Sequence, residues 1–172
     1  MIWAAYGCGV AAGLMAIGHA AGIAATQGFS SWVAASTIAS ANLVGSVLFG
    51  WLSDRVSHQS MLTTLPLISA MALIGFSVFL EQTLTLLGIL GFAYGGTIAA
   101  YPVAITTLFP GRAGPPHAYG LIFTPWGAAG LLAPWLAGQI YEWAGNYTTA
   151  LWLAARLSII SVVTAQKIIW KY

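Results

Sequence analysis

The sequence predicts an all-α membrane protein, a bundle of six transmembrane helices. Hydrophobic residues make up 59% of the 172 residues, whereas Asp, Glu, Lys and Arg together make up 5%. A soluble domain carries roughly a quarter charged residues, so this composition cannot cover a water-facing surface. Mean hydropathy is +0.86, and the eight Trp and seven Tyr are residues that concentrate at membrane interfaces. The expected surroundings are therefore lipid.

Apolar segments long enough to cross roughly 30 Å of hydrocarbon, at about 1.5 Å per helical residue, recur along the chain. They lack the alternation of apolar and polar residues that a membrane β-barrel requires, so helices are the remaining way to span the bilayer. Short polar breaks separate the segments. The predicted spans are residues 2–25, 31–53, 61–80, 83–109, 118–141 and 148–168.

The first span follows Met1 directly, without a basic segment before it, and is expected to stay as a helix rather than to be removed as a signal. It carries Gly9 and Gly13, then Gly18 and Gly22. The fourth span carries a pair with the same spacing, Gly91 and Gly95. Small residues four apart let helix backbones approach closely, which predicts a tight bundle.

The third, fourth and fifth spans contain prolines, each of which removes a backbone hydrogen bond and can bend its helix. Bent helices suit a molecule that opens and closes, although membrane helices tolerate proline in general. The prolines within the spans are Pro66, Pro102, Pro125 and Pro134.

Basic residues predict the orientation. The second break, the fourth break and the carboxy-terminal tail carry Lys or Arg, whereas the first, third and fifth breaks carry none. By the positive-inside rule, both termini are expected in the cytoplasm, with Glu81 and Glu142 outside. The basic residues concerned are Arg55, Arg112, Lys167 and Lys171.

Several function classes are excluded. A net charge of +2 from scattered residues does not favour nucleic-acid binding, which needs clustered Lys and Arg. The single cysteine, Cys8, has no disulfide or metal partner, and His58 and His117 have no neighbours at metal-ligand spacing. The spans contain no Asp pair, and His19 has no acidic partner, so we expect neither an enzyme nor a cofactor.

Three stretches resemble the major facilitator superfamily. In residues 50–59, Gly50, Asp54 and Arg55 match the first half of the signature G-x-x-x-D-R-x-G-R-R, which lies between the second and third helices of each half; Ser-His-Gln replaces its last three residues. Residues 91–97 and 119–134 are similar to the fourth and fifth helices of the carboxy-terminal half in oxalate/formate antiporter-like and monocarboxylate-transporter-like members. The resemblance aligns the chain with helices seven to twelve, half of a major facilitator fold.

This resemblance implies transport of a small solute across the plasma membrane, such as the inner membrane of a bacterium, and an organic anion as substrate, with antiport as one mode. The oxalate/formate group is expected to hold its dianion with a Lys in helix eleven and an Arg in helix eight. Here Trp126 stands in place of the Lys, and the second span has no Lys or Arg. Both expected charges are thus absent, which argues against oxalate itself as the substrate.

The resemblance also assigns roles to side chains. Gly50, Asp54 and Arg55 would form a gating contact between halves; the alternative is a solvated ion pair worth less than about 1 kcal/mol. Polar groups in cavity-facing spans would orient the substrate, although each can instead make an interhelical hydrogen bond worth about 0.6 kcal/mol. His19 can also switch charge near neutral pH. The candidates for the substrate path are His19, Asn42, Tyr94, Thr97, Tyr101, Tyr119, Thr124 and Trp126.

Arg156 lies about nine residues into the sixth span, where an arginine costs roughly 2.5 to 3.5 kcal/mol to insert. Such a charge is a functional candidate. A snorkelling arginine, an inter-subunit arginine and drift in a decayed gene are the alternatives, because helix twelve of the family is usually peripheral to the transport path.

Six helices supply one of the two bundles that alternating access requires. The expected partners are the lipid bilayer, a small-molecule substrate, and either a missing amino-terminal half or a second copy in a parallel homodimer. The alternative function is that of a truncated, non-transporting remnant or a membrane interaction subunit.

Overall fold

The computed structural model describes residues 1–108 and 114–169, and their side chains except at 80, 108, 114–119, 168 and 169. These residues form seven α-helices and one 3-10 turn, η1 (Leu80–Gln82). The α-helices are α1 (Ile2–Ile17), α2 (Ala20–Ala25), α3 (Ser31–Leu52), α4 (His58–Gly75), α5 (Thr83–Leu108), α6 (Gly114–Ala144) and α7 (Thr148–Ile169).

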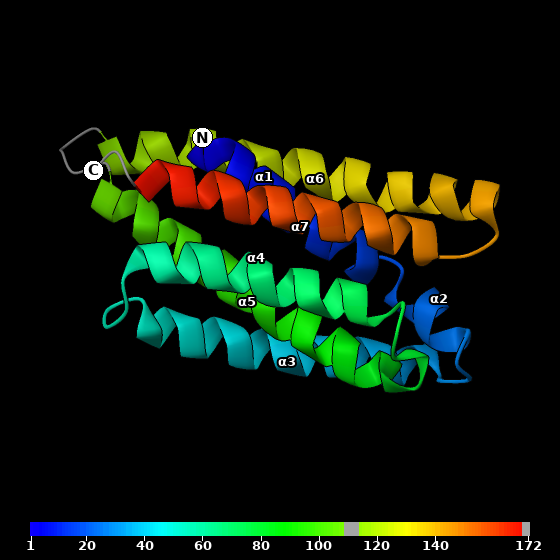
Figure 1. Ribbon diagram of the computed structural model, residues 1–172. Coiled ribbons are helices and arrows are strands. Elements are labelled where there is room, and N and C mark those ends of the chain that lie inside the picture. Colours follow the sequence, from blue (N-terminus) through cyan, green and yellow to red (C-terminus); the bar gives the residue numbers. More distant parts are fainter. Residues whose placement is uncertain (109–113, 170–172) are drawn as a thin grey trace.

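The long helices form two layers (Figure 1). In one layer α1 packs against both α6 and α7, and in the other α5 packs against both α3 and α4. Contact between α4 and α7 joins the layers on one side of the bundle.

The predicted span 2–25 is two helices rather than one. α1 ends at Ile17, and α2 begins at Ala20. Between them, the backbone N–H of His19 bonds to the Ala16 carbonyl at 3.2 Å, an i to i−3 bond that tightens the last turn, and His19 then leaves the helical region at φ −115°, ψ 13°. The predicted count of six helices is therefore not confirmed, since the described residues contain seven α-helices.

By length and apolarity, four of the described helical segments qualify to cross a membrane. These are Ser31–Leu52, Thr83–Thr107, Gly120–Ala144 and Thr148–Lys167. α1 is apolar but has 16 residues, and α4 begins and ends earlier than the predicted span 61–80. α4 starts early because the Ser57 hydroxyl accepts a hydrogen bond from the Ser60 backbone N–H at 3.2 Å and so caps the helix.

The glycine pair of the fourth predicted span joins α5 to α3. A Cβ atom at Gly91 would lie 2.8 Å from the Ile38 carbonyl oxygen, and one at Gly95 would overlap the backbone of Asn42. At this crossing the Ser46 hydroxyl donates to the Gly95 carbonyl oxygen at 3.2 Å. The two backbones touch because no side chain separates them, as the spacing predicts.

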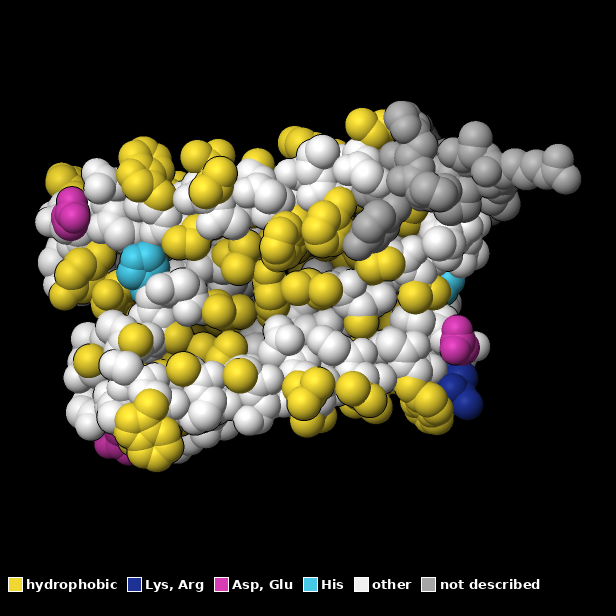
Figure 2. Space-filling view, turned by 180° about the vertical axis from the view of Figure 1, so that it is seen from behind, with side chains coloured by type: hydrophobic (Ala, Val, Ile, Leu, Met, Phe, Trp, Pro, Cys, Tyr) yellow, Lys and Arg dark blue, Asp and Glu magenta, His cyan; other side chains and the backbone are white. Residues whose placement is uncertain are grey.

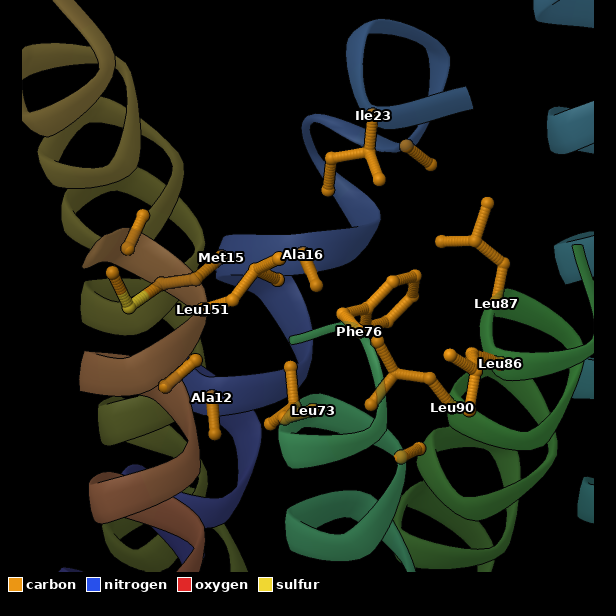
Figure 3. Packing of buried hydrophobic residues seen from close by; sticks show 14 of the residues in the cluster. Ala12, Met15, Ala16, Ile23, Leu73, Phe76, Leu86, Leu87, Leu90 and Leu151 are labelled. Carbon is orange, nitrogen blue, oxygen red and sulfur yellow. The ribbon is translucent and has the colours of Figure 1, made fainter. Parts of the chain in front are cut away.

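Buried apolar side chains hold the two layers together (Figure 3). Phe76 follows α4 and packs among Leu73, Leu86 and Leu90, while Met15 of α1 lies beside Leu151 of α7. All of these side chains are less than a tenth exposed. The side of the bundle formed by α4 and α7 is thereby closed by packing.

Among the residues that the structure describes, the charged ones lie toward the ends of the bundle, apart from Arg156. The start of α1, the end of α7 and the connection with Asp54 and Arg55 lie at one end (Figure 1). Glu81 and Glu142 lie at the opposite end. Asp54 and Arg55 thus lie at the end opposite Glu81 and Glu142, as expected if successive polar breaks lie at opposite ends of the bundle. Arg112 and Lys171 lie outside the described residues.

Candidate functional site

An open depression of about 460 Å³ lies where α1 and α2 are interrupted. α1 and α2 form one wall, and α3 and α5 supply the others. Its polar side chains are Asn42 of α3 and Tyr94 of α5, both predicted substrate-path residues. The remaining lining is apolar or glycine: Ile17, Gly18, Ala20, Ala21, Ala35, Ile38 and Ala39.

Tyr94 connects this depression to α6. The indole N–H of Trp126 donates to the Tyr94 hydroxyl oxygen at 3.1 Å. An indole nitrogen only donates, so the tyrosine must accept here and keeps its own O–H proton for another acceptor. The Tyr94 ring lies against Gly13 of α1, where a Cβ atom would come within 2.7 Å of it. Helix α1 thus fixes the ring, and α6 fixes its hydroxyl.

A row of aromatic rings leads inward from Trp126. Its indole, which is 36% exposed, stacks on Phe123 at 5.1 Å between centroids, and Phe123 lies 5.9 Å from Tyr6. Tyr6 in turn lies 4.4 Å from Tyr101, which is 2% exposed. Tyr101, predicted to line the path, is therefore part of the buried core and does not line the depression.

Two predicted threonines use their hydroxyls within their own helices. Thr97 donates to the Ala93 carbonyl at 2.8 Å, and Thr124 donates to the Leu121 carbonyl at 2.7 Å. Thr124 also accepts from the indole N–H of Trp3 at 2.9 Å. Neither lines the depression. The side chain of Tyr119, the remaining candidate on α6, lies outside the described residues.

His19 occupies the break itself but faces α6 and the turn before α7. Its Nδ1 lies 3.3 Å from the Met15 carbonyl oxygen, and its ring centroid lies 5.6 Å from that of Tyr147. Burial, with a smaller contribution from Tyr141, raises the pKa of Tyr147, so the ring beside His19 stays neutral. His19 is thus placed near the depression without lining it.

The Gly50, Asp54 and Arg55 motif lies at the end of the bundle that holds the termini. Arg55 folds back onto α3: its Nη1 donates to the Trp51 carbonyl at 3.1 Å, and its Cζ lies 3.9 Å above the Trp51 ring. Asp54 is exposed, and within the described residues neither an ion pair nor a hydrogen bond joins it to Arg55. Its carboxylate is open to a partner from outside this bundle.

Arg156 lies far from these groups, on the exposed side of α7. Figure 2 views the bundle from behind; on that face acidic side chains lie at both ends and basic side chains at one end. The depression has no Lys or Arg in its described lining. No three His, Cys, Asp or Glu of the described residues come together as a metal site.

Sequence reasoning missed the helix break and the Trp3–Thr124 hydrogen bond. The spacing of Gly18 and Gly22 predicts close helix packing, and a Cβ atom at Gly18 would lie 3.0 Å from Pro134 of α6. Nothing in the spacing, however, distinguishes a glycine at a helix crossing from one at an interruption. The partners of Trp3 depend on how α1 and α6 are rotated about their axes.

Comparison with known proteins agrees with the bundle and its motif. The family model of the Major Facilitator Superfamily matches residues 1–171, nearly the whole chain. Comparison with individually curated proteins gave no significant match. Members of this family are membrane transporters of small solutes rather than enzymes. This integral membrane protein, with a neutral polar depression between its helices, therefore belongs to the major facilitator superfamily.

Proposed function

We propose that the chain forms the carboxy-terminal half of a transporter that moves a small organic anion by alternating access, within the oxalate/formate or monocarboxylate subgroup. The proposal rests mainly on the Tyr94 hydroxyl. Its oxygen accepts a hydrogen bond from the Trp126 indole N–H, so the hydroxyl proton remains available to a ligand. Asn42 lines the same depression and adds an amide N–H₂. These donors suit the oxygens of a carboxylate.

The chemistry of the depression favours a monocarboxylate over a dicarboxylate. Its described lining offers hydrogen-bond donors at Tyr94 and Asn42 and is otherwise apolar or glycine. A second carboxylate would need further donors or a cation, and the basic residues described here, such as Arg55 and Lys167, lie elsewhere. A positive charge that balances the anion would therefore come from the other half.

Alternating access needs a second bundle to close the depression. We propose an amino-terminal half as that partner, with a parallel second copy as the alternative. In this arrangement α1 and α2 make one crossing together, which gives six crossings with both termini in the cytoplasm. Asp54, exposed and without a described ion-pair partner, supplies the gating contact across the halves.

The test is uptake of labelled formate, lactate and oxalate into liposomes that contain the chain alone or with an amino-terminal half. We expect saturable lactate or formate uptake, reduced at least tenfold by Tyr94→Phe. Tyr141→Phe is the matched control, because Tyr141 stacks on Tyr147 outside the depression. Uptake of none of the three anions in either arrangement contradicts the proposal and favours a non-transporting interaction subunit.

A further inference from the structure

Arg156 is a charge within an exposed apolar stripe of α7. Side chains of α7 that point into the bundle, such as Ala154 and Ser158, are fully buried against α1 and α4. The opposite stripe of α7 is exposed and large, with Trp152, Ile160 and Val163 each more than 40% exposed. Arg156 lies one turn from both Trp152 and Ile160, in the middle of this stripe.

The bundle supplies nothing to balance this charge. Within the described residues, Arg156 makes no hydrogen bond, ion pair or ring contact, whereas Arg55 has both a carbonyl and an indole as partners. It lies eight residues after Thr148, or about 12 Å along a span that crosses roughly 30 Å of hydrocarbon. An intramembrane arginine normally pairs with an acidic group or a backbone carbonyl.

The lipid interface is a poor partner at this depth. A helical side chain leans toward the amino-terminal end of its helix, which for Arg156 is the nearer membrane surface. Trp152 stands one turn along that route on the same stripe. To reach the headgroups on that side, the guanidinium would have to extend past the position of Trp152.

A second copy of this chain cannot supply the acidic partner either. The sequence contains three acidic residues, Asp54, Glu81 and Glu142. All three lie toward the ends of the bundle, outside the depth of Arg156 in either orientation. The complementary carboxylate must therefore lie outside the residues of this sequence.

We propose that the outer stripe of α7, formed by Trp152, Arg156, Ile159, Ile160 and Val163, docks a transmembrane helix of a different protein that carries an Asp or Glu at the depth of Arg156. The apolar side chains pack against that helix, and the ion pair sets its depth and rotation. This interface lies on the side away from the depression, so it does not depend on the proposed transport function.

The test uses a synthetic probe helix of Leu and Ala in phosphatidylcholine vesicles. Two versions of the probe are made, with the single Glu about eight residues from the amino-terminal end of the apolar stretch in one and about eight from the carboxy-terminal end in the other. Each version carries a Cys one helical turn beyond the Glu. The chain carries Ile160→Cys in a Cys8→Ala background. We expect the Glu helix to form the interchain disulfide at least fivefold more than a matched Gln helix, and Arg156→Gln to abolish that preference. Equal cross-linking of the two helices overturns the proposal.

A second measurement separates the proposal from lipid binding. In the absence of a probe helix, Arg156→Leu is expected to raise the melting midpoint of the chain in phosphatidylcholine, because it removes an unpaired charge. The Glu helix is expected to raise the midpoint of the unaltered chain but not of the variant. If Arg156→Gln instead reduces the bound anionic lipid seen by native mass spectrometry, without any preference for the Glu helix, the arginine serves a headgroup and the proposal fails.

Discussion

The indole nitrogen of Trp126 on α6 lies 3.1 Å from the hydroxyl oxygen of Tyr94 on α5, at the edge of the depression between α1, α2, α3 and α5. These two helices otherwise touch little, and each packs mainly against other helices. The hydrogen bond is therefore a direct tie between them, and it sets the direction in which Tyr94 offers its proton.

The first prediction concerns this tie. Trp126→Phe and Tyr94→Phe each remove the same hydrogen bond, so each is expected to cost about 0.5–1 kcal/mol. Because the bond is shared, the double variant should cost less than the sum of the two single variants. The free energies of unfolding of the unaltered chain, the two single variants and the double variant form a double-mutant cycle, and reversible unfolding in mixed micelles measures them. Additive effects would show that the two side chains act independently.

A second prediction concerns the crossing of α3 and α5. Gly95→Ala places a methyl group against the Asn42 backbone, and separation of the helices is expected to cost about 1–3 kcal/mol. Gly50→Ala is the control, because a Cβ there meets nothing within 4 Å. The control should be neutral or slightly stabilising, since Ala favours helix more than Gly does. Thermal unfolding in detergent compares the stabilities of the two variants. Equal losses of stability would contradict the close crossing of α3 and α5.

The third prediction is that substitution of Asp54 impairs transport without destabilising the isolated chain. Asp54→Asn should change the unfolding free energy of the isolated chain by less than about 0.5 kcal/mol, because the exposed carboxylate has no described ion-pair partner. With the other half present, the same variant should slow uptake severalfold. Glu81→Gln, at the opposite end, is the control for loss of an exposed acid. A large stability loss in the isolated chain would place the Asp54 contact within this bundle.

The proposed orientation gives a fourth prediction. In a Cys8→Ala background, a cysteine at Asn146 should react with an impermeant maleimide on intact cells, because the turn before α7 faces outside. A cysteine at Ser57, at the end that holds the termini, should react only after permeabilisation. Reaction of both positions from the same side would contradict the bundle, and the reverse pattern would invert its orientation.

Some of the site was predictable from residue type alone. Asn42, Tyr94 and Trp126 are polar or ring side chains in spans that face the cavity in related transporters. The structure places Asn42 and Tyr94 in the lining of one depression and joins Trp126 to Tyr94 by a hydrogen bond. Thr97, Tyr101 and Thr124 have the same chemistry but point to their own backbone, the core or Trp3. Helix rotation decides between these outcomes, and composition does not record it.

The sequence by itself determined the membrane environment and the helical character of the chain, because both follow from local hydropathy and from the scarcity of Lys, Arg, Asp and Glu. It also indicated close helix packing at Gly91 and Gly95, and the structure identified α3 as the partner helix. Only the tertiary structure decided that the first span breaks at His19, that Tyr94 meets Trp126, and that Arg156 faces outward. Each depends on which surfaces of distant helices fit together, a property of packing between segments rather than of any one segment.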